Sequence, residues 1–279
     1  MNNNYIEENK KWWNEMAEIN YHSKLYDVER FIKGEKELLP VVKNGIKEYV
    51  KDKDILHLHC HFGMDSISLI REGAKSVTGV DFSAEAIKYA NSLKDDLRLD
   101  NLDYIECNVL ELDKFLDKKY DMVFATLGVI TWIGDLNKWM KIASNFLKED
   151  GILYLMDYHP FAATFAHGPG VSELKIEYDY FEKDRPYHFE NEVAYSNPSI
   201  KLKNASNEWQ HSISEIINVI ASNKMRIEKF KEYPFIDYHK FDFMIETPDK
   251  NYWYLPNYDL PYMFSIVARR EKDNEYNRN

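Results

Sequence analysis

The chain has 279 residues, enough for one large domain or two small ones, and 44% of them are hydrophobic, which is typical of a globular protein. Its formal net charge of -11 opposes broad binding to a phosphate backbone, so we do not expect a nucleic-acid-binding protein. No apolar stretch approaches the roughly 18–20 residues of a membrane helix, and the first residues lack the pattern of a signal peptide. We therefore expect no membrane partner.

The numbers of cysteine and aromatic residues suggest the cellular compartment of the protein and the character of its binding pocket. Two cysteines, Cys60 and Cys107, cannot form a disulfide scaffold, which favours a reducing cytoplasm. Aromatic residues make up 15% of the chain, with 20 Tyr, 15 Phe and 6 Trp. This share predicts a pocket with ring-bearing walls as well as a hydrophobic core.

Strand and helix patterns alternate up to residue 158. Segments with the composition of short buried strands lie at 55–59, 76–81, 103–107, 120–126 and 151–158. Helical periods lie at 35–50, 65–72 and 135–147, and another runs from Ser83, the expected N-cap, through Ala90. This alternation predicts a Rossmann-like, doubly wound α/β sheet that is mostly parallel and has helices on both faces.

The pattern changes at Pro160. Residues 160–208 are polar and aromatic without a clear period, and we interpret them as an insertion that covers the substrate. A helix is predicted at 212–222, and strands at 225–233 and 262–268. Because no helical period separates these two strands, we expect an antiparallel pair that closes the edge of the sheet. No linker or repeat is visible, which predicts a single domain over residues 1–279.

The loops after the predicted strands form the candidate site, because ligands of an open parallel sheet bind beyond its carboxyl ends. Asp81 ends the second strand, where a carboxylate can accept hydrogen bonds from a ribose diol or stabilise the N-terminus of the next helix. Phe82 can lie against an adenine face or pack in the core. Asn108 offers the amide donor and acceptor that suit the edge of adenine, or it forms a turn.

The loop after the first strand contains one glycine, Gly63, where a dinucleotide fingerprint needs three. This predicts a cofactor with adenosine but without a pyrophosphate, and a dinucleotide-dependent oxidoreductase is the less favoured alternative. His57, His59, Cys60 and His61 are residue types that bind transition metals. Their side chains alternate between two faces of a strand, and no second cluster has the spacing of a structural zinc site, so we expect no metal.

Two motifs at these strand ends are distinctive. Residues 58–66 read LHCHFGMDS, and residues 77–83 read VTGVDFS. Further positions of the same pattern are Trp132, Asp135, Leu136, the turn at 148–151, His159-Pro160, Trp209, His211-Ser212 and Tyr254-Leu255-Pro256. With these residues the chain resembles the class I S-adenosylmethionine-dependent methyltransferases over nearly its whole length. More narrowly, it resembles a bacterial branch whose first loop carries Cys-His-x-Gly.

The resemblance implies a methyltransferase with S-adenosylmethionine as its cofactor. The residues implied to bind the cofactor are Trp13, His59, Gly63, Asp81, Phe82, Asn108, Val109 and Leu127. Gly63 would let the backbone approach the methionine part, and Asp81 would hold the ribose hydroxyls. Phe82 would contact adenine, and Asn108 with Val109 would meet its edge.

The resemblance also implies a lid, formed by residues 1–34, in which Trp13 folds over the cofactor. Leu127 would line the cofactor's other side. His59 stands where the wider superfamily commonly has an acid, and His61 stands where it has a glycine. An aspartate often occupies the place of Asn108.

Methyl transfer from a sulfonium is an in-line displacement, and much of its rate can come from holding the acceptor about 3–3.5 Å from the methyl carbon. A base is needed only where the acceptor must lose a proton, so no catalytic residue is assigned from the sequence. We expect a small-molecule acceptor, with His159, Tyr180 and His211 as candidate pocket residues; each can instead serve capping or packing. A protein that binds the cofactor without catalysis is the other alternative.

Overall fold

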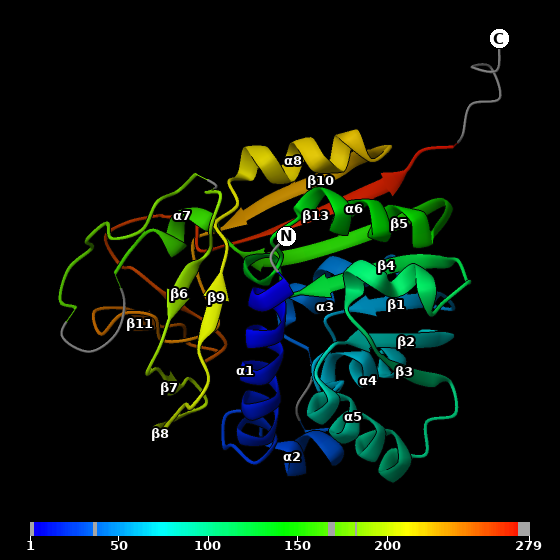
Figure 1. Cartoon of the computed structure of the whole chain (residues 1–279), viewed down its shortest axis with the longest axis horizontal. Helices are drawn as coiled ribbons and strands as arrows, with labels where there is room; N and C mark the ends of the chain where they lie inside the picture. The colour runs from blue at the N-terminus through cyan, green and yellow to red at the C-terminus, as the bar shows by residue number, and fades with distance from the viewer. Residues whose placement is uncertain (1–2, 36–37, 167–170, 182, 273–279) are drawn as a thin grey trace.

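A seven-stranded sheet forms the centre of the computed structural model, which describes residues 3–35, 38–166, 171–181 and 183–272 (Figure 1). Its strand order is β10-β13-β5-β4-β1-β2-β3. The strands are β1 (Asp54–Leu58), β2 (Ser76–Asp81), β3 (Leu102–Glu106), β4 (Tyr120–Thr126), β5 (Leu147–Tyr158), β10 (Met225–Tyr233) and β13 (Met263–Arg270). Strands β1 to β5 are parallel, and β13 is antiparallel to both β5 and β10. The predicted sheet, mostly parallel with an antiparallel final strand, is confirmed.

Helices cover both faces of the sheet, as predicted. The helices of one face are α3 (Pro40–Ile46), α4 (Met64–Arg71) and α5 (Ala84–Leu97), and those of the other are α6 (Leu136–Phe146) and α8 (Ile213–Ser222). Because side chains alternate along a strand, Ile55 of β1 joins the first hydrophobic core and Leu56 joins the second. The strand composition that predicted the sheet reflects this burial on both faces.

Two N-terminal helices are present that the hydrophobic pattern does not predict: α1 (Asn3–Tyr21) and α2 (Val28–Ile32). The buried side of α1 contains Trp12 and Met16 but also Asn9, which interrupts the apolar period. The Asn9 amide donates to the Asn207 carbonyl at 2.8 Å, and its oxygen accepts the Asn207 N–H at 2.7 Å. The buried Asn9 side chain is therefore satisfied by a partner 198 residues away in the sequence.

The helix expected at 35–50 is wrong in its length, because α3 begins only at Pro40 and ends at Ile46. Proline lacks a backbone N–H and has a fixed φ, so it suits the first turn of a helix. Residues 36–37 lie outside the described part of the chain. Gly45 is required by packing, since a Cβ there would lie 2.3 Å from the hydroxyl oxygen of Tyr154.

The predicted insertion forms several small elements. These are α7 (Pro160–Ala163), β6 (Tyr187–Phe189), β7 (Val193–Ala194), β8 (Asn197–Lys201) and β9 (Ser206–Glu208). Strand β6 pairs with β9, and β7 pairs with β8. The connection between β10 and β13 adds a further pair, β11 (Ile245–Glu246) with β12 (Trp253–Tyr254). Figure 1 shows these pairs gathered at one end of the sheet, near α1, and α1 packs directly on β9 and α5.

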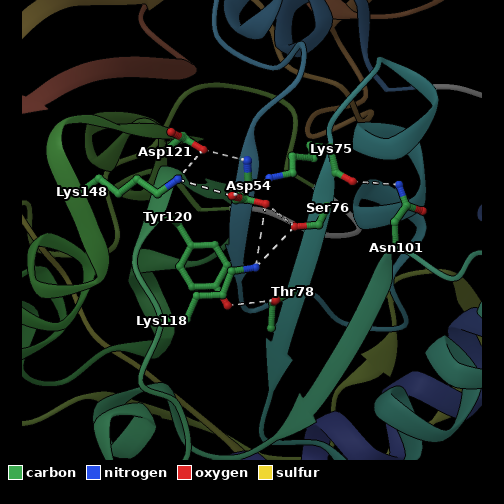
Figure 2. A network of polar contacts seen from close by, with 9 residues as sticks. All are labelled: Asp54, Lys75, Ser76, Thr78, Asn101, Lys118, Tyr120, Asp121 and Lys148. Carbon is green, nitrogen blue, oxygen red and sulfur yellow. Dashed lines mark hydrogen bonds and ion pairs between the residues drawn. The ribbon is translucent and has the colours of Figure 1, made fainter.

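A polar network joins the N-terminal ends of β1, β2, β4 and β5, at the end of the sheet opposite to the small strand pairs (Figure 2). The Ser76 hydroxyl donates to Asp54 Oδ1 at 2.7 Å, and Lys148 Nζ lies 2.9 Å from Asp121 Oδ2 and 3.4 Å from Asp54 Oδ2. The Ser76 hydrogen bond holds the pKa of Asp54 below its usual value. The network therefore stabilises the N-terminal ends of the strands. The candidate site lies at the other end of the sheet, where the strands have their carboxyl ends.

Candidate active site

The loop between β1 and α4 makes a tight turn with three residues in the left-handed region. His59, His61 and Gly63 have φ values of 57°, 51° and 81°. A Cβ on Gly63 would lie 2.1 Å from the hydroxyl oxygen of Tyr104, and that hydroxyl donates to the Gly63 carbonyl at 3.2 Å. The positive φ favours glycine here, and the position of the Tyr104 side chain leaves no room for a Cβ.

Asp81 lies beside this loop at the end of β2. Its Oδ2 accepts the His61 N–H and its Oδ1 accepts the Ser83 N–H, each at 2.9 Å. The side chain is 6% exposed, and burial raises its pKa to about 6 against the lowering effect of these donors. Each carboxylate oxygen has two lone pairs, so both can accept a further hydrogen bond from a ligand.

The residues expected near adenine lie on neighbouring strand ends. Phe82 is partly exposed, and its ring contacts no other ring among the described residues. The Asn108 side chain accepts the Leu110 N–H at 3.0 Å and caps the 3-10 helix η1 (Val109–Lys114). The Val109 side chain is buried in the core that contains α6 and α8. Asn108 therefore forms a turn, as the alternative interpretation proposed, and its amide nitrogen still faces no described partner.

One carboxylate organises the loop after β4. Leu127 and Gly128 in this loop have φ values of 43° and 76°. Asp157, in β5, accepts the N–H groups of Gly128 at 2.6 Å, Val129 at 2.9 Å and Ile130 at 2.8 Å. It is 3% exposed, and burial raises its pKa although the N–H donors lower it. Asp157 thus fixes the backbone around Leu127, a predicted cofactor contact.

The side chains of His57, His59 and His61 each contact a different part of the structure. His57 Nδ1 lies 2.7 Å from a serine hydroxyl of α4, His59 Nε2 accepts the indole N–H of Trp139 at 3.0 Å, and His61 contacts α1. Burial lowers their pKa values to about 3, 4 and 3, so all three rings are neutral at pH 7. Within the described ranges, no group of three or more His, Cys, Asp or Glu side chains is arranged to hold a metal ion.

Helix α1 reaches the loops after β1, β2 and β4. The ring of Trp13 lies 5.3 Å from that of His61 and 5.1 Å from that of Trp132, between ring centroids. Trp132 belongs to the short helix η2 (Ile130–Trp132) in the loop after β4. The Asn14 side chain accepts the Ser83 hydroxyl at 2.8 Å. The N-terminal segment is therefore joined to three of the four loops that form the candidate site.

A cavity of about 210 Å³ opens beside the carboxyl ends of β4 and β5, and we call it the β4–β5 cavity. Its walls come from the loop after β4, from the insertion and from the connection after β10. The aromatic residues that line it include Tyr158, Tyr178, Tyr187, Phe189, Trp209 and Tyr238. The polar residues that line it include Thr131, Asp157, Glu208, His211 and Lys240. The aromatic composition thus corresponds to a cavity as well as to the core.

Of the predicted pocket residues His211 and Tyr180, His211 lines the β4–β5 cavity and Tyr180 does not. His211 Nε2 donates to the Ile133 carbonyl at 2.6 Å, and Nδ1 lies 2.8 Å from a Glu215 carboxylate oxygen. Both ring nitrogens are therefore engaged within the protein. The Tyr180 hydroxyl accepts the Ile213 N–H at 3.3 Å, at the start of α8.

His159, the third predicted pocket residue, lies just outside the cavity lining. Its Nδ1 accepts the Phe161 N–H at 3.1 Å and caps α7, and its Nε2 lies 2.9 Å from a Glu232 oxygen. Burial lowers its pKa. These contacts correspond to the capping alternative, because neither ring nitrogen faces the cavity.

Glu208 and Lys240 line the cavity but are not among the residues predicted from the sequence, and neither is Asp157, described above. Glu208 ends β9, and Lys240 lies in the connection after β10. Burial raises the pKa of Glu208 to about 7 and lowers the pKa of Lys240 to about 8. The available signal was weak: both residues stand in short aromatic stretches, NEWQH at 207–211 and DYHKFDF at 237–243.

A further carboxylate, that of the partly exposed Asp237, lies in the same connection. Its Oδ2 is 3.4 Å from the Tyr158 hydroxyl, and its Oδ1 is buried without a hydrogen-bond partner among the described residues. Burial raises the pKa of Asp237 to about 6, and the nearby Asp65 and Asp157 raise it further. A cationic or hydrogen-bond-donating group of a ligand would satisfy this oxygen.

We expect Asp237→Asn to stabilise the ligand-free protein by about 1–2 kcal/mol above pH 7. In the unfolded chain this carboxyl group ionises near pH 4, whereas in the folded protein its pKa is about 6. Its ionisation therefore lowers the free energy of unfolding as the pH rises from about 4 to about 6, and the variant lacks this loss. Thermal unfolding at pH 7.5 and pH 4.5 tests this, with exposed Asp113→Asn as the control. A lower melting temperature of Asp237→Asn at pH 7.5 would contradict it.

Comparison with known protein families gives a match over most of the sheet and its loops. A family model described as a methyltransferase domain matches residues 50–218, more than half of the chain. The chain belongs to this methyltransferase family. The match covers β1 to β5, the loops that follow them and the insertion, so the loop of Gly63, Asp81 and Glu208 all lie within the methyltransferase domain.

Individual relatives are distant from this methyltransferase. A ribosomal protein L11 methyltransferase from Lactobacillus johnsonii is 33% identical over 78 residues, which are 28% of this chain and 24% of that protein. Solved structures of S-adenosylmethionine-dependent methyltransferases from Mesorhizobium loti and Clostridium acetobutylicum are each 16% identical, with a TM-score of 0.57. The first covers 82% of this chain and 96% of that chain, and the second covers 93% and 99%. At this identity the two structures establish the shared fold.

The expected fold and enzyme class of the methyltransferase are thus confirmed. The expected cofactor, S-adenosylmethionine, agrees with the names of both structural neighbours. Across the described residues, no helix combines the length and apolar character required to span a bilayer.

Proposed function

We propose that this methyltransferase moves a methyl group from S-adenosylmethionine to a small molecule in the β4–β5 cavity. The observation that carries the proposal is the position of the cavity, which is bordered by Gly128, Ile130 and Thr131 of the loop after β4. Leu127 of the same loop is the predicted contact of the cofactor. The partial relative modifies a ribosomal protein by name, but a cavity volume of about 210 Å³ favours a small acceptor.

The side chains at the strand ends fit this cofactor. Asp81 offers two buried oxygens with free lone pairs for the two ribose hydroxyls. The partly exposed Phe82 ring and the Asn108 amide are placed for adenine, and the unpartnered Asp237 Oδ1 suits a cation. When bound, S-adenosylmethionine supplies an electrophilic methyl group on a sulfonium. The residues of this chain bind the acceptor, align it and exclude water.

We propose that the described residues 3–34 of the predicted lid at 1–34 cover the cofactor, and that the described residues of 160–208 cover the acceptor. Residues 1–2, 167–170 and 182 lie outside the described part of the chain. Trp13 on His61 supports the lid, and Asn20, which donates to the Tyr195 hydroxyl at 2.6 Å, joins the lid to the cover. We also propose that the enzyme belongs to the bacterial branch named above, and the sequence of the first loop, Cys60-His61-Phe62-Gly63, supports this. Cys60 and Cys107 are both buried free thiols, which is in keeping with the cytoplasm.

Isothermal titration calorimetry tests the cofactor. We expect S-adenosylmethionine and its demethylated product, S-adenosylhomocysteine, to bind with one site per chain and micromolar dissociation constants, and NAD to give no heat. All three ligands contain adenosine and only NAD carries a pyrophosphate, so this contrast isolates the missing pyrophosphate-binding glycines. Binding of NAD without binding of S-adenosylhomocysteine would revive the oxidoreductase and overturn the proposal.

A further inference from the structure

The β4–β5 cavity is lined by Glu208 and Lys240 in addition to Asp157, whose carboxylate accepts N–H groups of the loop after β4. Glu208 enters from β9, and Lys240 enters from the connection after β10. Both side chains line the same cavity of about 210 Å³, so the two charges lie near one another. In the described part of the chain, however, they form no ion pair within 4.0 Å. Glu208 and Lys240 are each partly exposed, and a ligand that carries both complementary charges can pair with both of them.

Backbone hydrogen bonds hold Glu208 against the loop after β4. The N–H of Trp209 donates to the Thr131 carbonyl at 2.7 Å, and the Thr131 hydroxyl donates to the Trp209 carbonyl at 3.2 Å. A Cβ on Gly134 would lie 2.7 Å from the Trp209 ring, so glycine permits this close approach. Glu208 is thus fixed relative to the loop at which the proposed function places the methyl donor.

Aromatic rings form the other walls. Tyr178 and Tyr187 meet edge to face with 5.3 Å between ring centroids, and Tyr178 lies 6.1 Å from Phe189. The cavity volume of about 210 Å³ lies below the range of about 300–1,000 Å³ that is typical of pockets for drug-sized ligands. The walls therefore suit a small molecule with one ring, placed between the two charges.

Resting on the proposed function, we propose that the acceptor is a small aromatic zwitterion whose carboxylate pairs with Lys240 and whose ammonium pairs with Glu208. Glu208 takes one proton from the ammonium, and the freed lone pair on nitrogen forms the bond to the methyl carbon. The electron pair of the broken carbon–sulfur bond stays on sulfur, which leaves a neutral thioether. Glu208 gives its proton to water after the product leaves.

The ionisation of the two residues agrees with these roles. Burial and the nearby Glu192 raise the pKa of Glu208, whereas Lys240 and a hydrogen bond from Thr131 lower it, with the value near 7. A carboxylate with a pKa near neutrality is a more effective proton acceptor than an ordinary glutamate. Tyr178 and Tyr238 also face Glu208, but both tyrosines stay protonated because burial raises their pKa values.

Three matched ligands test the inference on protein saturated with S-adenosylhomocysteine. Phenylalanine carries both charges, phenethylamine lacks the carboxylate and 3-phenylpropionate lacks the ammonium. We expect calorimetry to show phenylalanine binding at least tenfold more tightly than either singly charged ligand. Lys240→Met should reduce its affinity to that of phenethylamine, and Glu208→Gln should reduce it to that of 3-phenylpropionate.

Exposed Glu190→Gln and Lys201→Met are the matched controls and should keep the wild-type preference. All four variants should bind S-adenosylhomocysteine within twofold of wild type, which verifies folding. Equal binding of the three ligands, no binding of any, or the same loss in the control variants would overturn the inference while the proposed function stands. A wild-type protein that does not bind S-adenosylhomocysteine would instead contradict the proposed function.

Discussion

Asp81→Asn is expected to weaken binding of both S-adenosylmethionine and S-adenosylhomocysteine by about 10- to 100-fold. A hydrogen bond to a charged group contributes about 1.5–3 kcal/mol, and each 1.4 kcal/mol corresponds to a factor of ten. The carboxylate can accept both ribose hydroxyls, whereas the amide nitrogen of asparagine cannot accept either. Both ligands contain the same ribose, so calorimetry should show the same loss for both.

The pH dependence separates charge from shape at this position. Burial raises the pKa of Asp81 to about 6, so the ligand-free wild-type carboxyl group becomes protonated below that pH. Wild-type affinity should therefore fall as the pH decreases below 6, whereas the affinity of Asp81→Asn should stay level. Exposed Asp100→Asn is the control and should follow the wild-type profile. Unchanged affinity in Asp81→Asn at pH 7.5 would contradict the assigned role.

Asp157→Asn is expected to destabilise the protein by about 2–4 kcal/mol. The carboxylate accepts N–H groups of Gly128, Val129 and Ile130, and the N–H of Tyr158 at 2.7 Å. Asparagine keeps one acceptor oxygen and turns an NH₂ group toward the remaining donors. Each buried donor that loses its partner costs about 1–3 kcal/mol, which outweighs the relief from removing a buried charge.

Urea unfolding of Asp157→Asn and Asp237→Asn at pH 7.5 measures both free energies directly. The same chemical change should act in opposite directions, because Asp157 has four N–H donors and Asp237 Oδ1 has none among the described residues. Asp157→Asn should also weaken S-adenosylhomocysteine binding, since the loop of Leu127 loses its anchor. Equal stability of Asp157→Asn and wild type would show that this carboxylate does not organise the loop.

The central sheet could be predicted because its causes are local in sequence. Strands β1, β2, β4 and β13 are short, largely buried runs. Ser83 caps α5 by accepting the Ala86 N–H at 3.1 Å, as its position predicts. Asp81 stands out for the same reason, since the end of β2 follows from the alternation of strands and helices. Helix α1 was not predicted, because the polar residue Asn9 on its buried side is matched by Asn207, far away in the chain.

The β4–β5 cavity could not be predicted because long, irregular connections assemble it. Glu208 and Lys240 come from segments without a hydrophobic period, and nothing in the sequence places them beside each other. His159 and His211 were suggested by their positions after strands and beside aromatic residues. The His159 ring instead contacts Glu232, which is 73 residues away in the sequence. The His211 ring contacts Glu215, four residues further along the chain.

A crystal structure with S-adenosylhomocysteine tests most directly whether the carboxyl ends of these strands bind the cofactor. We predict the ribose hydroxyls on the Asp81 carboxylate, adenine beside Phe82 and Asn108, and the sulfur directed toward the β4–β5 cavity. Density for the nucleoside at another place, with Asp81 contacting only the N–H groups of His61 and Ser83, would contradict the account.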